Sequence, residues 1–390
     1  MYRAFFVSAA VLSAAVIGGT VVCGTAVVGV DVQAATPPQA APAAAGSAAS
    51  PVRITNAKLQ PVAASGALTA QIKGLIDQSA QPAWIAYLQP IVDSTLGGCC
   101  GNWSDGHTVC CGGCALEERM PGASGTAGTV QAAPGPIKLE GASEFIVLVR
   151  VEAQRIERIR VFSGDCDLDA GGLVVHVLNG VRAADSIAFL ESTLQTWPTN
   201  DRKGMPDAAV MGIALHKDPG ADAALRRLLE PTQTDQMRRK ALFWTARARG
   251  RQGFEAVRRA LKDDPSPNVR KEAVFALTQS REPEVVPTLL DAARTHPTAE
   301  VRGQALFWLA QKAGKQAEAA ITRAIDEDPE TSVKERAVFA LSQLPKDEGI
   351  PLLIQVARTN RNPAVRKKAM FWLGQSKDPR AIDFFESILK

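Results

Sequence analysis

The sequence predicts a small α+β N-terminal domain followed by an all-α, right-handed solenoid of helical pairs. Three observations predict this order. From residue 205 to the end, the pattern of apolar residues repeats every 32 positions, which is typical of stacked helical repeats. Between residues 53 and 200, short apolar segments alternate with turn residues, as strands do. An aromatic content of only 5% suits a helix-rich protein whose core consists mainly of alanine and leucine.

The repeat is visible as two adjacent residues, usually valine and a basic residue, that recur without insertion or deletion. The five copies are Met237-Arg238, Val269-Arg270, Val301-Arg302, Val333-Lys334 and Val365-Arg366. Four positions after the first residue of each copy there is an alanine. Eight positions after it there is a leucine, except in the first copy, which has Thr245. These positions share one helix face, so we expect a buried stripe along the first helix of each repeat.

The helix ends repeat as well. Three positions before each copy we expect a residue whose side chain caps the helix N-terminus. The residues there are Thr234, Ser266, Thr298 and Asn362, while Glu330 breaks the pattern and Thr331 is expected to replace it. A second helix is expected after each first one, for example over 254–262 and 285–294. With a degenerate copy at 205–236, the sequence predicts about six 32-residue repeats over 205–390.

Two segments show a family resemblance. Residues 268–277 (NVRKEAVFAL) and 364–374 (AVRKKAMFWLG) resemble the first helix of bacterial HEAT-like repeats, of the short type found in phycobilisome lyases. The resemblance covers 205–390, roughly the C-terminal half of the chain. It implies a HEAT-like solenoid, and it implies a scaffold that binds a protein partner more readily than an enzyme.

The preceding part, 53–200, reads as a cysteine-containing α+β domain. We expect a helix over 65–78, a strand over 83–88 and a third strand over 173–178. Segments 145–151 and 156–162, with a turn at Ala153-Gln154, suit an antiparallel hairpin with one solvent-exposed face. Asp185 is expected to cap a helix that runs to Gln195.

Residues 1–35 resemble a secretory signal peptide. Arg3 precedes an uncharged apolar run from Ala4 to Val30, and small residues offer a cleavage site near Ala34 or Ala35. The alternative is an uncleaved membrane anchor, because the run is long enough to span a bilayer. Residues 36–52 are rich in proline and alanine and read as a disordered linker. Either way we expect the protein to be exported, to the periplasm or outside the cell, with a membrane contact only if the anchor is retained.

Export bears on the cysteines of the segment 99–114 and its surroundings. They are Cys99, Cys100, Cys110, Cys111, Cys114 and Cys166. An even number of cysteines in an oxidising compartment favours disulfides, with Cys99 and Cys100 bridging to the 110–114 group and Cys166 taking the remaining thiol. The alternative is a metal- or thiol-dependent enzyme centred on 99–114, since Cys111-x-x-Cys114 with Cys99 or Cys100 and His107 could bind zinc or an iron–sulfur cluster.

Two further series of residues follow the repeat. Six positions after the start of each copy stand Phe243, Phe275, Phe307, Phe339 and Phe371. Ten positions after it stand Arg247 in the first copy and then Gln279, Gln311, Gln343 and Gln375. Trp244, Trp308 and Trp372 follow every second phenylalanine, and alanine follows the others, which gives a 64-residue superperiod that duplication of a two-repeat block explains.

The phenylalanines and glutamines lie on one side of the helix, away from the buried stripe. One interpretation is a partner-binding surface of stacked aromatic and amide side chains. The other, which we favour, is that the phenylalanines pack between repeats and the glutamines satisfy backbone groups at helix ends, because an exposed row of phenylalanines would promote aggregation. Similarly, we expect the basic residue of each copy to be solvated and to pair with an acid of the adjacent repeat, such as Asp264 or Asp328.

Composition and motifs argue against other function classes. A net charge of +4, from 44 basic and 40 acidic residues, does not indicate nucleic acid, and export makes it improbable. The segment from Asp165 to Gly171 resembles the start of a calcium loop but has its glycine one position late, so a turn is favoured. No catalytic constellation, metal site or cofactor motif is apparent. The sequence therefore predicts an exported, non-enzymatic scaffold that binds a protein.

Overall fold

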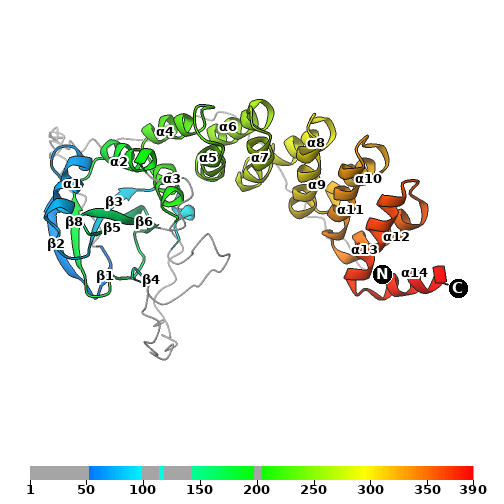
Figure 1. The fold of residues 1–390 in the computed structure, drawn as a ribbon, viewed down its shortest axis with the longest axis horizontal. Helices are drawn as coiled ribbons and strands as arrows, with labels where there is room; N and C mark the ends of the chain where they lie inside the picture. The colour runs from blue at the N-terminus through cyan, green and yellow to red at the C-terminus, as the bar shows by residue number, and fades with distance from the viewer. Residues whose placement is uncertain (1–51, 99–113, 118–141, 197–203, 390) are drawn as a thin grey trace, which may run out of the picture. The chain divides into compact units, whose positions relative to one another are not determined.

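The computed structural model describes residues 52–98, 114–117, 142–196 and 204–389. Within them, an α+β domain precedes a series of paired helices (Figure 1). The first part comprises β1 (Ile54–Thr55), β2 (Lys58–Ala63), α1 (Leu68–Gln78), β3 (Ala83–Pro90), a 3₁₀ turn (Ser94–Leu96), β4 (Cys114–Ala115), β5 (Glu144–Glu152), β6 (Arg155–Ser163), β7 (Leu168–Asp169), β8 (Val174–Asn179) and α2 (Ala183–Thr196). The predicted signal peptide and nearly all of the predicted linker lie outside the described residues.

Five strands form the main sheet, in the order β2-β8-β3-β5-β6. β2, β8 and β3 are parallel, and β5 pairs antiparallel with β3 and β6. After β2 the chain crosses over through α1 and returns as β3, parallel to β2 but not adjacent to it. The later strand β8 lies between β2 and β3. The predicted hairpin is present. Its turn residues Ala153 and Gln154 both have positive φ, of 49° and 57°, as the tight turns that match strand twist require.

A second, small sheet covers one face of the main sheet. It consists of β1, β7 and β4, all parallel. Between the two sheets lies a hydrophobic core that includes Trp84, Leu148 and Leu168. The expectation of one solvent-exposed face on the hairpin was therefore wrong for β5. Its residues from Phe145 to Val149 are all buried, because the small sheet occupies the face that we expected to be open.

Helices α1, α2 and α3 (Met205–Leu215) contribute to the core on the opposite face of the main sheet. This core includes Tyr87 and Phe145 of the sheet, and it continues through α3 to Met237 and Ala248 of α5 (Asp235–Ala248). The hydrophobic core is thus continuous across the expected boundary between 200 and 205. Helix α2 begins at Ala183, so Asp185 lies in its first turn, paired with Arg182, instead of capping it.

The C-terminal part consists of six helical pairs, as predicted. The remaining helices are α4 (Gly220–Leu228), α6 (Gly250–Asp263), α7 (Pro267–Gln279), α8 (Val285–Thr295), α9 (Ala299–Ala313), α10 (Lys315–Glu327), α11 (Thr331–Ser342), α12 (Lys346–Thr359), α13 (Pro363–Ser376) and α14 (Pro379–Leu389). The expected stripe is buried. Every alanine of the stripe is 0% exposed, and Thr245, which replaces leucine in the first copy, is 4% exposed.

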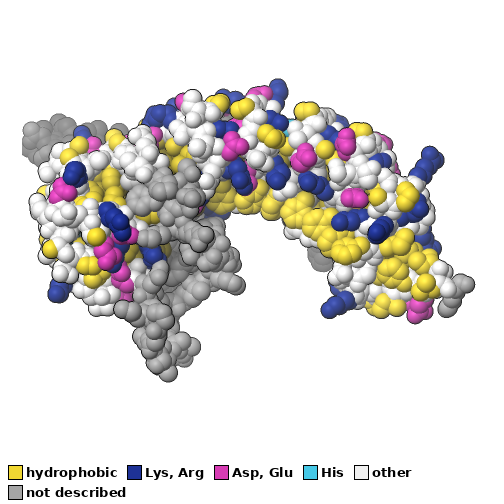
Figure 2. All heavy atoms as spheres, in the orientation of Figure 1, with side chains coloured by type: hydrophobic (Ala, Val, Ile, Leu, Met, Phe, Trp, Pro, Cys, Tyr) yellow, Lys and Arg dark blue, Asp and Glu magenta, His cyan; other side chains and the backbone are white. Residues whose placement is uncertain are grey.

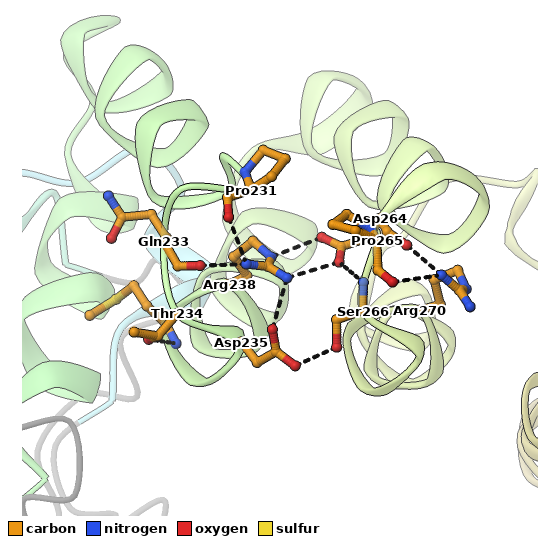
Figure 3. Close-up of polar contacts among 10 residues, drawn as sticks. Pro231, Gln233, Thr234, Asp235, Arg238, Asp264, Pro265, Ser266 and Arg270 are labelled. Carbon is orange, nitrogen blue, oxygen red and sulfur yellow. Dashed lines mark hydrogen bonds and ion pairs between the residues drawn. The ribbon is translucent and has the colours of Figure 1, made fainter.

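The basic residue of each copy binds backbone carbonyls of the preceding repeat, and in two copies it also pairs with an aspartate of its own repeat. Arg238 makes two hydrogen bonds to the carboxylate of Asp264, at 2.9 and 3.0 Å, and it also donates to the backbone carbonyls of Pro231 and Gln233 (Figure 3). Arg302 bonds Asp328 in the same way, at 2.8 and 2.9 Å. The acids were predicted correctly, but the arginines are not solvated. Arg238 and Arg302 are 2% and 7% exposed, and each acid belongs to the same repeat as its arginine.

The other three basic residues bind backbone carbonyls and no carboxylate that the structure describes. Arg270 donates to the carbonyl of Asp264, Lys334 to that of Asp326 and Arg366 to that of Asn360. In each case the cation lies at the C-terminal end of the preceding helix, where the free carbonyl groups and the helix dipole favour positive charge. All five copies therefore share one contact, and only two of them add an ion pair.

The predicted N-cap register is correct, but side-chain capping is not general. Thr234 accepts a hydrogen bond from the N–H of Met237, and Asn362 accepts one from the N–H of Ala364. Ser266 and Thr298 occupy the N-cap position without such a bond. Ser266 instead donates to Asp235 of the preceding repeat (Figure 3). Thr331 does not replace Glu330, because it is already the first residue of α11.

Candidate functional site

The five predicted phenylalanines lie along the first helices of the repeats and form, with two tryptophans, one continuous series of ring contacts. We call this series the aromatic ladder. In order it consists of Phe243, Phe275, Trp308, Phe307, Phe339, Trp372 and Phe371. Consecutive ring centroids are 4.8 to 5.8 Å apart, within the range of favourable aromatic contacts. Phe307 and Phe339 are nearly parallel, with an angle of 7° between them.

The aromatic ladder packs between repeats, as the favoured interpretation expected, but it is not sealed from solvent. Phe243, Phe275, Phe307 and Phe339 are half-buried, and Phe371 is 50% exposed. Figure 2 shows hydrophobic side chains gathered along one edge of the repeat helices. The ladder therefore satisfies both interpretations in part, since its rings contact the neighbouring repeat and still present an edge to a partner.

The two tryptophans of the ladder were not among the predicted site residues. The indole N–H groups of Trp308 and Trp372 are buried and have no hydrogen-bond acceptor among the described residues. Trp372 also lines a groove of about 200 Å³ between α11, α12 and α13, together with Gln343 and Gln375. The signal that could have found them is the 64-residue superperiod, which places a tryptophan after every second phenylalanine.

The glutamines border the ladder and bond side chains rather than backbone groups at helix ends. Gln311 donates to the side-chain oxygen of Gln343 in the next repeat, at 3.2 Å. Gln343 in turn donates to Ser342, and Gln279 donates to Thr278. Gln311 and Gln375 are exposed. Amide groups that can both donate and accept hydrogen bonds therefore lie beside the aromatic edge.

Basic side chains also border the ladder. The Lys368 ammonium lies 5.7 Å from the ring centre of Phe371 and 6.0 Å from that of Trp372, within the range of cation–π contacts. Lys312, next to Gln311, donates to the backbone carbonyl of Thr278. Burial and the nearby Arg281 together lower the pKa of Arg247, which stands in the glutamine register of the first copy. A cation thus lies directly against the rings at the C-terminal end of the ladder.

The cysteine segment can be placed only in part. Cys99, Cys100, Cys110 and Cys111 lie outside the described residues, and Cys114 begins β4. Cys166 is 2% exposed, and its sulfur lies 3.6 Å from the carbonyl oxygen of Gly98, the residue before the segment. The structure thus brings Cys166 to the start of the cysteine segment, although 67 residues separate them in sequence. The disulfides and the alternative metal or thiol chemistry stay predictions.

The segment that resembles a calcium loop is divided among other contacts. Asp165 accepts a hydrogen bond from Ser163, Asp167 pairs with Arg53, and Asp169 accepts from Asn56. Within the described parts of the chain, no three His, Cys, Asp or Glu side chains come together as a metal site would require. The segment forms β7 and a turn, as favoured from the sequence.

One buried polar group has the residue types of a nucleophile and a base. His216 lies 3.0 Å from the hydroxyl of Ser186, which is 3.1 Å from that of Tyr87. All three side chains are 0% exposed, so no substrate reaches them in this conformation. Burial lowers the pKa of His216 to about 4 despite its hydrogen bond to the backbone of Gly212. These residues connect β3, α2 and α3, and we interpret them as a structural contact between the sheet and the first helical pair.

Comparisons with known proteins agree with this architecture. The paired helices define an α-solenoid. Residues 223–390 match the model of HEAT repeats in three overlapping stretches, 223–310, 286–351 and 317–390, and this part of the chain therefore consists of HEAT repeats. The resemblance noted in the sequence is thus confirmed for the solenoid. None of the helices that the structure describes is both long and apolar enough to cross a membrane.

No curated protein matches the chain. Among the solved structures that resemble it are the following three. Human deoxyhypusine hydroxylase is 17% identical, with 52% of this chain and 77% of that one covered and a TM-score of 0.23. The complex of CpcE and CpcF of phycocyanin lyase from Nostoc sp. PCC7120 is 20% identical, with 50% and 78% covered and a TM-score of 0.29. The S. pombe condensin Cnd3–Cnd2 subcomplex is 16% identical, with 49% and 28% covered and a TM-score of 0.32. These likenesses concern the fold alone.

Proposed function

We propose that the protein is an exported, non-enzymatic scaffold whose aromatic ladder binds a protein segment that carries apolar and acidic side chains. The observation that carries the proposal is the ladder itself. It is an unbroken series of rings that remains partly exposed, and it contains two buried indole N–H groups without an acceptor. HEAT repeats stack into extended surfaces that commonly bind protein partners, which supports the same proposal.

The side chains of the ladder suit a peptide chain. A backbone carbonyl of the partner that enters the groove lined by Trp372 would accept a hydrogen bond from its indole, a bond that no described residue supplies. Apolar side chains would cover the half-buried rings, and the exposed amides of Gln311 and Gln375 would bond the peptide backbone. Tryptophan is also among the residues that contribute most to the binding energy of protein interfaces.

The charge of the partner follows from the surroundings of the ladder. Lys368 and Lys312 border it, and the repeat at 237–268 contains nine basic and three acidic residues. Positive potential along a binding surface favours acidic partners and disfavours basic ones. An acidic, apolar segment therefore complements the ladder better than a purely apolar one.

Export is supported by the apolar run and the small residues that end it at Ala34 and Ala35. In an oxidising compartment the six remaining cysteines would form disulfides that stabilise the α+β domain. The position of Cys166 beside Gly98 supports a bridge between the β6–β7 loop and the cysteine segment. No observation in the described residues favours the metal- or thiol-dependent alternative.

Photo-crosslinking from the ladder face tests the interaction. A crosslinker in place of Gln343 in the full chain should label a partner in the native host, whereas one in place of Glu318 on α10 should not. The labelled segment is then titrated against the purified protein. A Gln311→Glu variant should weaken binding roughly tenfold by repelling acidic groups, and Gln311→Lys should strengthen it. Equal labelling from both positions, or stronger binding by Gln311→Glu and weaker binding by Gln311→Lys, would refute the proposal.

Mass spectrometry of the native protein tests export and the state of the cysteines together. We expect an N-terminus just after Ala34 or Ala35 and a mass that accounts for six oxidised, metal-free cysteines. An intact N-terminus in a membrane fraction would favour the anchor instead. Free thiols with stoichiometric zinc or iron would support the enzyme that we consider the alternative.

A further inference from the structure

A second groove lies between α4 and α6. It has a volume of about 270 Å³. One wall is the α4 face with Leu225, Arg226 and Leu229, and the other is the α6 face that runs from Gln252 to Arg259. The floor comes from α5, where the groove reaches Thr245. Helices α5 and α6 approach each other closely there. A Cβ atom on Gly253 would lie only 2.0 Å from the carbonyl oxygen of Thr245, so this position requires glycine.

The floor of this groove contains an unsatisfied hydroxyl. Thr245 is only 4% exposed, and its side-chain oxygen has no hydrogen-bond partner among the described residues. The four later copies of the repeat have leucine at this position, as in Leu309. A buried hydroxyl without a partner is uncommon and unfavourable. Burying the Thr245 hydroxyl without a hydrogen bond therefore destabilises the fold relative to leucine. A ligand that bonds the hydroxyl would offset this loss.

The walls of the groove carry excess positive charge. Four arginines and only two acids line it, and Arg249 is occupied by two hydrogen bonds to Asp222, at 2.7 and 2.8 Å. Arg226 and Arg259 are exposed, lie on opposite walls and have no acidic partner among the described residues. Two guanidinium groups that face one space suit an anion with several oxygens, because a guanidinium donates two parallel hydrogen bonds.

The first turn of α6 adds a third feature that favours an anion. The groove is lined by residues 251–253, which belong to the start of this 14-residue helix. The first N–H groups of a helix have no partner within it, and the helix dipole favours negative charge at this end. Phosphate groups bind at such positions in many proteins.

We propose that the groove between α4 and α6 binds a phosphate group, either free or on a small organic molecule. Arg226 and Arg259 hold the phosphate oxygens from the two walls, the start of α6 contributes its dipole, and the hydroxyl of Thr245 bonds the part of the ligand that reaches the floor. The site differs from the aromatic ladder, so the two proposals can fail independently.

Calorimetric titration of the full chain tests this site with four probes: inorganic phosphate, pyrophosphate, glucose 6-phosphate and glucose. We expect binding of at least one phosphate probe and none of glucose. If only inorganic phosphate and pyrophosphate bind, the ligand is free phosphate. If glucose 6-phosphate binds more tightly, the ligand is an organic phosphate. No detectable binding of any phosphate probe at about 10 mM would overturn the proposal.

Three variants locate the binding. A double Arg226→Gln, Arg259→Gln variant should raise the dissociation constant at least roughly tenfold. Thr245→Val, which keeps the shape and removes the hydroxyl, should raise it roughly threefold or more. Arg323→Gln is the matched control, because Arg323 occupies the register of Arg259 on α10, 64 residues later, and it should leave the constant unchanged.

The folded state and the ladder serve as further controls. Arg226 and Arg259 are exposed, so their substitution should leave the melting temperature within the error of the parent protein. A Trp308→Leu variant should bind phosphate as the parent does. Binding that survives in the double arginine variant, or falls equally in Arg323→Gln, would place the anion elsewhere and overturn the assignment.

Discussion

The contacts of the basic residue near the start of each repeat are of two kinds, and they alternate along the solenoid. In the repeats whose first helix is α5 or α9, a buried arginine makes two hydrogen bonds to an aspartate, as Arg302 does with Asp328. In the repeats whose first helix is α7 or α11, His296 and Asn360 stand at the position of the aspartate. The basic residue of these repeats binds backbone carbonyls instead. The alternation follows the 64-residue superperiod of the sequence.

The alternating position has one task in common. Asp264, His296, Asp328 and Asn360 each accept a hydrogen bond from the backbone N–H two residues later, at 2.8 to 3.1 Å. Aspartate, asparagine and neutral histidine can all supply that acceptor, so the turn tolerates any of them. The comparison teaches that the turn needs an acceptor in every repeat, while the ion pair is an addition confined to every second one.

Removing the aspartate should have the largest effect. Asp328→Ala leaves the guanidinium of Arg302 buried without its counterion and should lower the free energy of unfolding by about 3–5 kcal/mol. Asn360→Ala removes only the acceptor of one N–H and should cost about 1 kcal/mol. Chemical denaturation of both variants measures the difference.

Asp328→Asn sharpens the comparison, because asparagine keeps the acceptor and removes the charge. We expect the free energy of unfolding of Asp328→Asn to be closer to that of Asp328→Ala than to that of the parent protein. Equal stability of Asp328→Asn and the parent protein would show that the ion pair is dispensable, and the two kinds of contact would then be energetically the same.

Acid distinguishes the ion pairs from the contact between the sheet and the first helical pair. Burial lowers the pKa of His216 to about 4, whereas the unfolded chain takes up this proton near pH 6.5. The unfolded state therefore binds more protons between these values, and the free energy of unfolding should fall by up to about 3 kcal/mol from pH 6.5 to 4.

The Arg302–Asp328 pair should persist over the same range. Burial raises the pKa of Asp328, but hydrogen bonds from Arg302 and the N–H of Glu330 outweigh burial and leave the pKa below its usual value. The stability that this pair contributes is therefore present above the ordinary aspartate pKa and is lost only as the pH falls below it. Denaturation at several pH values checks both statements. A His216→Gln variant should lose most of the dependence between pH 6.5 and 4, and an unchanged dependence would assign it to another group.

Substitutions of an inner and of a terminal phenylalanine of the aromatic ladder should have the smallest effects. Phe339 contacts both Phe307 and Trp372, so Phe339→Ala should lower the free energy of unfolding by about 2 kcal/mol. Phe371 is 50% exposed and contacts Trp372 and Lys368, so Phe371→Ala should cost less than about 1 kcal/mol. Thermal unfolding ranks the two variants. A larger loss for Phe371→Ala would mean that the ladder is not mainly a contact between repeats.

The sequence alone predicted the solenoid because each repeat contacts mainly its neighbours. Val269, Ala273 and Leu277 are buried for reasons that their own spacing on a helix reveals. The same helical periodicity predicted that the phenylalanines and glutamines lie on one side of the first helix of each repeat. It did not reveal that Arg238 and Arg302 are buried, because a basic residue looks the same in sequence whether it faces solvent or a carboxylate from a helix 26 residues later.

Long-range packing was the part that sequence patterns could not predict. The near-continuous apolar run of β5 shows burial on both faces only once the small sheet is known, and that sheet joins segments from 54, 114 and 168. Likewise, nothing in the pattern around Met205 indicated that α3 shares a core with Tyr87 and Phe145. The sequence did not predict the groove between α4 and α6, because a single threonine at a position that is otherwise leucine does not indicate a binding site.

The alternation of tryptophan and alanine after the ladder phenylalanines has a consequence for how such an array changes in length. Trp308 and Trp372 each contact the phenylalanine on the first helix of the preceding repeat. In those preceding repeats the tryptophan position holds the smaller Ala276 or Ala340. Loss of a single 32-residue unit through recombination would make two tryptophan-bearing helices neighbours and crowd the ladder. Loss or gain of two units would leave every neighbour unchanged. We therefore expect natural length variants of this protein to differ by whole 64-residue steps.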